Sequence, residues 1–224
     1  MVKRSYHAPR RQQQAAETRA AVIAAAHRLF VEQGYEATSI RQIASEAQVT
    51  GQTIFRIFGT KAALLQDALL AAYAGDSDAV PGRELEDLFA AVGAEATPTA
   101  RIRALGAWSL ASYARGSRDL EEVVFDAART DPRVAEFAGV FYDRIYQDSL
   151  AMVRAVAGDH RLPDGITAED IAEFVYAVWN IPTYRELVNE RGWTVDKYVA
   201  WMVLLMERMF IAYLDPPPDV DGQR

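Results

Sequence analysis

Apolar residues recur three and four positions apart over most of the chain, a spacing typical of α-helices that each bury one face. Near the N-terminus this pattern predicts a first helix that ends at Gly34, because a residue with positive φ commonly closes a helix. A short second helix follows, and Thr38 or Ser39 can cap its start. The apolar stripe of this second helix comprises Ile40, Ile43, Ala44 and Ala47.

A tight turn then leads to a third helix, which Thr50 can cap. Its inward residues are predicted to be Ile54 together with Phe55 or Phe58. Two short helices joined by a tight turn and packed on a first one predict a helix-turn-helix. The residues left facing outward from the third helix are Gln52, Thr53 and Arg56.

These outward side chains suit the major groove of DNA. Gln can pair with adenine through two hydrogen bonds and Arg with guanine, while the Thr methyl group can meet thymine. Hydroxyls, backbone N–H groups and a cation at the starts of the second and fourth helices can lie beside phosphates. The predicted DNA contacts are Thr38, Ser39, Thr50, Gly51, Gln52, Thr53, Phe55, Arg56, Thr60 and Lys61.

Over roughly residues 15–70 the segment resembles the DNA-binding domain of the TetR family of one-component bacterial transcription regulators. The residues that carry the resemblance are Phe30, Gly34, Tyr35, Thr38, Ile40, Ile43, Ala44, Ala47, Val49, Thr53, Phe58 and Lys61. Two positions depart from the family pattern: Phe55 stands where the family often has Tyr, and Ile57 where it often has an aromatic residue or His. Losing these phosphate contacts is expected to lower DNA affinity and its salt dependence, unless the N-terminal arm compensates.

The arm, residues 1–14, is basic and has no apolar period. It is either a loose, solvated terminus or a segment that reaches into the minor groove beside the helix-turn-helix. Charge favours a DNA-facing N-terminus, because residues 1–75 hold nine Lys and Arg against five Asp and Glu, whereas the whole chain has a net charge of −7. The basic residues of the arm are Lys3, Arg4, Arg10 and Arg11.

The apolar pattern of the rest of the sequence predicts more helices and nearly no strands, so the predicted fold class is all-α. A connecting helix is expected over 61–74, and a polar stretch with Gly and Pro over 75–82 marks a domain boundary. Further helices are expected at roughly 83–95, 99–115, 118–130, 133–157, 167–190 and 194–214. The predicted organisation is therefore an arm (1–14), a DNA-binding domain with the helix-turn-helix (15–60), the connecting helix (61–74), a ligand-binding and dimerisation bundle (75–214) and a tail (215–224).

The last two helices are apolar around most of their circumference, in 171–181 and 198–214. Such helices bury more than one face, either inside one large domain or against a second chain. The family resemblance favours a homodimer, whose two recognition helices would match successive major grooves of a palindromic operator. Pro182 is expected to kink the penultimate helix, which either opens space for a ligand or curves the helix around the core.

Aromatic residues of the predicted bundle are either ordinary core residues or the lining of an apolar cavity, in which Tyr and Trp would offer hydrogen-bonding groups. They suggest a lipophilic or aromatic effector. Glu122, Asp126 and Asp143 could select a cation, although carboxylates on helices more often face solvent. The candidate ligand-binding residues are Trp108, Tyr113, Phe125, Phe141, Tyr142, Tyr146, Phe174, Tyr176 and Trp179.

Nothing in the sequence indicates an enzyme, a metal site or a cofactor. The three His residues, at 7, 27 and 160, lack catalytic partners, and His27 is expected on a helix surface. The absence of Cys, of a signal sequence and of a membrane-length apolar run favours a cytoplasmic protein.

The resemblance implies a repressor that a ligand releases from its operator. The alternative is an all-α ligand-binding or scaffold protein with weakened DNA binding.

Overall fold

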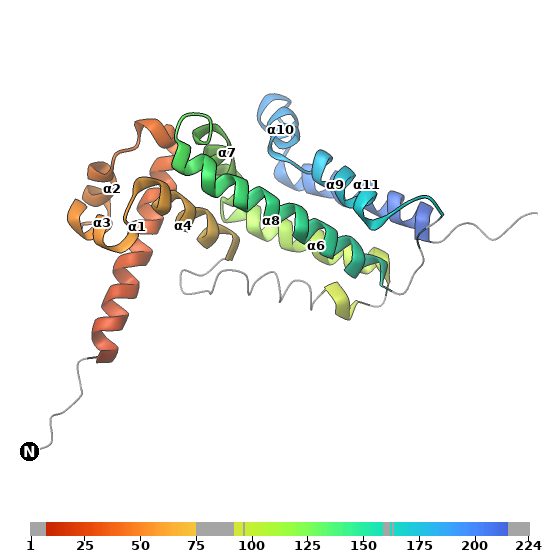
Figure 1. Ribbon diagram of the computed structural model, residues 1–224, viewed down its shortest axis with the longest axis horizontal. Helices are drawn as coiled ribbons and strands as arrows, with labels where there is room; N and C mark the ends of the chain where they lie inside the picture. Colours follow the sequence, from red (N-terminus) through yellow and green to blue (C-terminus); the bar gives the residue numbers. More distant parts are fainter. Residues whose placement is uncertain (1–7, 75–91, 96, 159–161, 163, 215–224) are drawn as a thin grey trace, which may run out of the picture. The chain divides into compact units, whose positions relative to one another are not determined.

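The computed structural model describes residues 8–74, 92–95, 97–158, 162 and 164–214, and every regular element in this part of the chain is helical (Figure 1). The chain divides into two compact units. The first unit comprises residues 1–83 and 114–139, and the second comprises 84–113 and 140–224. The predicted boundary at 75–82, most of the predicted helix at 83–95 and the tail lie outside the described residues. None of the described helices is long and apolar enough to cross a membrane.

The first helix, α1 (Ala8–Ala37), begins inside the stretch that the sequence assigns to the arm. That assignment is wrong for residues 8–14, because Pro9 is compatible with the first turn of a helix and the Gln- and Ala-rich sequence that follows favours helical structure. Near its other end the helix is interrupted at Gly34, which has φ 79° and ψ 166°. Such a conformation is open almost only to glycine, so the predicted end of the first helix at this residue is confirmed as a break.

Three short helices complete the N-terminal part of the first unit: α2 (Ile40–Glu46), α3 (Gly51–Phe58) and α4 (Lys61–Ala74). Helices α2 and α4 pack against α1, and α3 packs against α2 and α4 (Figure 1). The side chains at their centre are almost fully removed from water, and their burial supplies most of the stabilisation of this unit. They include Val22, Phe30, Ile43, Ile54, Leu64, Leu65 and Leu69.

Helix α7 (Ser117–Ala127) also belongs to the first unit and packs on both α1 and α4. His27 of α1 is half-buried there, so its predicted place on a helix surface is wrong. It comes close to Gly116, where an added Cβ would lie 2.4 Å from Nε2 of the imidazole. Burial lowers the pKa of His27 below its ordinary value, whereas the Asp119 carboxylate acts in the opposite direction.

The second unit is built mainly from α6 (Pro98–Ala114), α8 (Pro132–Ala157), α9 (Ala168–Val178) and α11 (Val195–Leu214). The first residues of α8 belong to the first unit. Helix α6 approaches α11 closely, because a Cβ at Gly106 would lie 2.3 Å from a methyl carbon of Val203. The core of the unit includes Ile102, Met152, Val153, Val156, Ile171, Ala172, Val175 and Met206.

The predicted single helix over 167–190 is wrong. Helix α9 ends at Val178, and a new short helix, α10 (Ile181–Tyr184), begins after Asn180 and continues into a π-helical turn, η1 (Arg185–Glu190). The Asn180 side chain caps α10 by accepting a hydrogen bond of 2.9 Å from the Thr183 N–H. Pro182 therefore lies in the first turn of a helix, where its missing N–H costs nothing, and the expected kink is a helix break.

Candidate nucleic-acid interface

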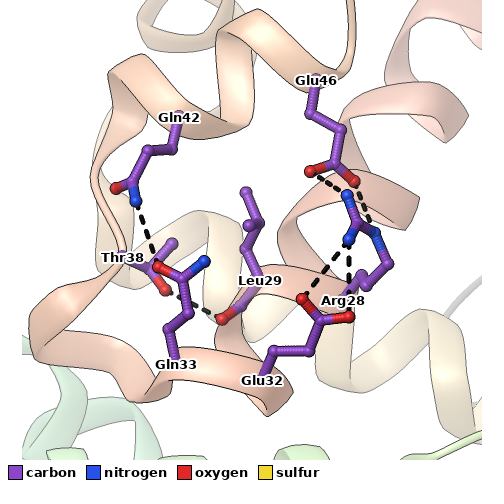
Figure 2. A network of polar contacts seen from close by, with 7 residues as sticks. All are labelled: Arg28, Leu29, Glu32, Gln33, Thr38, Gln42 and Glu46. Atoms are coloured by element: carbon purple, nitrogen blue, oxygen red, sulfur yellow. Dashed lines mark hydrogen bonds and ion pairs between the residues drawn. The ribbon is translucent and has the colours of Figure 1, made fainter.

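Polar contacts fix α2 on α1 (Figure 2). Arg28 of α1 donates a hydrogen bond of 2.8 Å to Glu46 at the end of α2, and Glu32 accepts from the same guanidinium. At the other end of α2, Gln42 donates to the side-chain oxygen of Gln33 over 3.1 Å. These contacts hold α2 at both ends, which sets the position of the turn that follows it.

The hydroxyl residues before α2 have different roles. Thr38 is buried, and its hydroxyl oxygen lies 3.0 Å from the Leu29 carbonyl oxygen and 2.8 Å from that of Gly34. Ser39 is exposed and forms a capping box with Gln42, in which each side chain satisfies the backbone N–H of the other residue. Of the two predicted caps, Ser39 is therefore the one observed, and Thr38 belongs to the core.

The turn between α2 and α3 is tightly defined. Gln48 has φ 54°, and the next residue, Val49, donates its N–H to the Ala44 carbonyl oxygen over 2.9 Å. Thr50 then caps α3 as predicted, because its hydroxyl oxygen accepts from the Thr53 N–H over 3.1 Å. The two threonine hydroxyls also lie 2.9 Å apart. The start of α3 is thus held by the turn and by its cap.

Helix α3 is strongly amphipathic. Ile54 and Phe58 are buried on its inner side, which decides the predicted alternative in favour of Phe58. Gln52 and Arg56 are exposed, Thr53 is partly exposed, and 54% of the Phe55 surface is accessible. Because residues spaced three and four positions apart share a helix face, Gln52, Phe55 and Arg56 form one outward surface.

The cations of α1–α4 fall into two groups. Arg19 forms an ion pair of 2.9 Å with Asp67, and Arg28 is bound by Glu32 and Glu46. Arg41 of α2 and Arg56 of α3 are both exposed and form no hydrogen bond or ion pair with any residue that the structure describes. Arg41 is not among the DNA contacts predicted from the sequence.

Lys61, a predicted phosphate contact, lies at the start of α4. Its ammonium group donates hydrogen bonds of 2.9 Å to the Tyr35 carbonyl oxygen and 3.2 Å to that of Thr38, and it lies 4.0 Å from the centre of the Tyr35 ring. Thr60 caps the same helix by accepting from the Ala63 N–H over 3.0 Å. Lys61 therefore joins the start of α4 to the end of α1 within the protein.

The predicted arm contacts are placed only in part. Lys3 and Arg4 lie outside the described residues. Arg10 and Arg11 belong to the first turns of α1. Their proposed role at DNA stays a prediction.

The candidate ligand-binding residues do not all fall in one unit. Phe125 lies on α7 in the first unit, and the other eight lie in the second. Within the second unit, the indole N–H of Trp179 donates a hydrogen bond of 2.6 Å to the Tyr113 hydroxyl. The rings of Tyr146 and Tyr176 meet edge to face, with their centres 6.0 Å apart. Phe174, by contrast, is 45% exposed on α9.

The same region matches a known protein family. Residues 22–68, which run from the middle of α1 through all of α2 and α3 into α4, match the N-terminal model of the bacterial regulatory proteins of the tetR family. The chain is also 28% identical over 138 residues to the uncharacterised helix-turn-helix-type transcriptional regulator YdeS of Bacillus subtilis. That alignment covers 59% of this chain and 67% of YdeS.

Solved structures share the fold over most of both chains. One is NalD, the secondary repressor of the MexAB-OprM multidrug efflux pump in Pseudomonas aeruginosa, with a TM-score of 0.61, 20% identity and coverage of 85% of this chain and 94% of NalD. Another is the transcriptional regulator FadR from Bacillus subtilis in complex with stearoyl-CoA, with a TM-score of 0.65, 14% identity and coverage of 83% and 96%. Residues 22–68 are therefore similar to the N-terminal region of the tetR family of bacterial regulatory proteins, and the chain as a whole shares its fold with these solved regulators.

Proposed function

We propose that this regulator is a sequence-specific repressor that binds a palindromic operator as a homodimer and is released by a small hydrophobic or aromatic ligand. The observation that carries the proposal is the outward surface of α3, where Gln52 and Arg56 are exposed. The backbone that carries them is held in place by Ile54 and Phe58, which are buried on the inner side of α3. A rigid helix with polar side chains held at its surface is what base reading in the major groove requires.

The contacts divide into those that read sequence and those that set position. Gln52 is suited to adenine and Arg56 to guanine, because each can form two hydrogen bonds with one base edge. Ser39, Thr53 and Thr60, at or near helix starts, are suited to phosphates, which fix the register without reading bases. Arg41 of α2 is also suited to a phosphate, because its side chain is exposed and is not bound to another described residue. We assign Arg10 and Arg11 of α1, with Lys3 and Arg4, to the flanking DNA.

A homodimer is supported by the exposed apolar residues of the second unit. Trp201 and Leu204, one turn apart on α11, are 52% and 39% exposed, and Phe174 of α9 is 45% exposed. Large apolar side chains exposed on helices are typical of protein interfaces. Pairing two copies through α9 and α11 would present two α3 helices to the DNA, and a spacing of about 34–36 Å would fit successive major grooves.

A ligand of lipophilic or aromatic character is supported by the aromatic residues of the second unit. Tyr113 and Trp179 contribute large apolar surfaces, which a lipophilic or aromatic molecule can contact, and the hydrogen bond between them fixes the two rings. FadR, which shares the fold, has been solved with stearoyl-CoA. Repression is supported by NalD, a repressor of the same fold. A coupling of about 1–3 kcal/mol between ligand and DNA would make release depend on ligand concentration.

Two linked experiments test the proposal. Purified protein is used to select bound DNA from a random pool, and the selected DNA is then titrated in gel-shift assays with and without stearoyl-CoA and a panel of aromatic compounds. The expected results are a palindromic sequence and a loss of affinity of about 5- to 150-fold with at least one compound. Failure to enrich any sequence would instead favour an all-α ligand-binding or scaffold protein with weakened DNA binding. Phe55 and Ile57 support this alternative, because they depart from the family pattern at two positions that can contact phosphate. Unchanged affinity with every compound that binds would contradict ligand release.

A further inference from the structure

Phe55 is an unusual residue on the surface of a DNA-reading helix. Among the described residues of α1–α4, only Val31 and Phe55 are large apolar side chains with substantial exposure, at 40% and 54%. Exposing an aromatic ring to water forgoes the stabilisation that its burial would give. The ring lies on the face of α3 that also presents Gln52 and Arg56, so whatever those two side chains contact lies within reach of Phe55 as well.

The chemistry of the ring restricts what it can recognise. A Phe side chain has no hydrogen-bonding group, so it gains nothing from the donors and acceptors that distinguish most base edges in the major groove. Thymine differs, because its C5 methyl group is the one apolar group that a base presents there. A ring next to that methyl group buries apolar surface on both partners, whereas cytosine leaves the same position empty.

We propose that Phe55 reads a thymine by contact with its C5 methyl group and so contributes directly to sequence specificity. The proposal rests on the DNA-binding function proposed above. Gln52 lies one turn before Phe55, and its preferred partner is adenine. The two residues together predict A·T base pairs at neighbouring positions of each half-site, beside the guanine assigned to Arg56.

The local structure makes this contact specific rather than adaptable. The neighbour of Phe55, Ile54, is 1% exposed, and Phe58, one turn later, is 7% exposed. At the start of the helix the Thr50 cap holds the first turn. With the backbone held at both points, the ring has only its own two side-chain torsions to adjust, so its position relative to the groove is set by α3 as a whole.

The test removes one methyl group of the DNA at a time. In the selected operator, each thymine of one half-site is replaced in turn by deoxyuridine, which lacks only the methyl group, and the dissociation constant is measured by fluorescence anisotropy at fixed salt. For the wild-type protein, one replacement is expected to weaken binding about threefold to fivefold, the size of effect expected for one buried methyl group. Phe55→Ala is expected to bind the thymine and deoxyuridine forms of that position equally.

Two further variants keep the result interpretable. Phe55→Leu retains an apolar side chain and keeps part of the sensitivity, and Val31→Ala, the matched change at the other exposed apolar residue, keeps the wild-type pattern. Thermal melting followed by circular dichroism shows whether each variant folds. The proposal is overturned if the wild-type protein is indifferent to every methyl group, if Phe55→Ala keeps the sensitivity, or if the selected half-sites contain no thymine. Failure to select any DNA would overturn the proposed function instead.

Discussion

The Tyr73 hydroxyl donates a hydrogen bond of 2.8 Å to Oε2 of Glu121, and the same oxygen accepts a hydrogen bond of 2.7 Å from Arg118. Tyr73 lies in the last turn of α4, and Glu121 and Arg118 lie on α7. Glu121 and Arg118 are only 2% and 4% exposed. Helix α4 is therefore tied to α7 through a buried carboxylate, which joins two helices of the first unit.

The buried pair gives a stability prediction. Glu121→Leu removes the carboxylate and leaves the Arg118 guanidinium without it, so the free energy of unfolding is expected to fall by about 3–5 kcal/mol. The double variant Arg118→Met, Glu121→Leu removes both charges and is expected to recover most of this loss, because apolar side chains of similar size can replace a buried ion pair. Urea denaturation of the three proteins measures both effects. Equal free energies of unfolding of Glu121→Leu and the wild type would show that the ion pair does not stabilise the fold.

Arg115 provides a second prediction, about the end of α4. Its guanidinium donates hydrogen bonds of 3.0 Å to the Ala72 carbonyl oxygen and 2.7 Å to that of Tyr73, which satisfies carbonyls that a helix end leaves without partners. Arg115→Ala is expected to raise the hydrogen-exchange rate of amides in the last turns of α4. Arg129→Ala is the matched control, because the Arg129 side chain is exposed and bound to no other described residue. Equal exchange in the two variants would contradict the assigned role.

The Tyr35 hydroxyl donates a hydrogen bond of 2.7 Å to Asp131, and this hydrogen bond is the main reason that the pKa of Asp131 lies below its ordinary value. Stabilisation of this kind is present above the unfolded-state pKa, near 4, and is lost as the pH falls through the folded-state pKa. Tyr35→Phe is therefore expected to lower the free energy of unfolding by about 1 kcal/mol at pH 7, and by progressively less in acid. The ring that Lys61 contacts is retained. Chemical denaturation from pH 7 to pH 3 tests this, and a difference that does not change with pH would refute it.

The proposed dimer surface predicts a change of oligomeric state. Trp201→Glu places a charge in the exposed apolar area of α9 and α11, so the variant is expected to be monomeric in light scattering after size-exclusion chromatography and to bind a palindrome more weakly. Val140→Glu is the control, because Val140 is 71% exposed but lies on α8. The dimer surface is misplaced if Val140→Glu dissociates the protein or if Trp201→Glu leaves a dimer.

Local sequence signals were sufficient for the helices around the turn. Thr50 and Thr60 are strong caps next to clear apolar stripes, so α3 and α4 could be predicted closely. The break after Val178 could not, because the cap at Asn180 competes with a continuous apolar pattern that runs on to Ile181. The packing of α7 on α1, which half-buries His27, joins two helices that are far apart in the sequence, and no periodic pattern within either helix encodes it.

The exposure of the candidate DNA-contacting residues could be predicted only in part from the sequence. Spacing alone could place Gln52 and Arg56 outward, whereas the choice between Phe55 and Phe58 as the inner residue needed the packing of α3 on its neighbours. The hydroxyl of Thr38 and the ammonium group of Lys61 are used inside the protein because α1 ends beside the start of α4. Such contacts between separate helices are set by tertiary structure, which local patterns do not specify.

The most direct test of sequence reading by α3 is the affinity of the purified protein for its selected palindrome, compared with a shuffled duplex of the same length and composition at one fixed salt concentration. The palindrome is expected to bind at least about a thousandfold more tightly. Arg56→Ala is expected to lose about 1–3 kcal/mol of binding free energy on the palindrome and little on the shuffled duplex. Equal affinity of the wild-type protein for both duplexes would contradict the proposal that the outward surface of α3 reads DNA sequence.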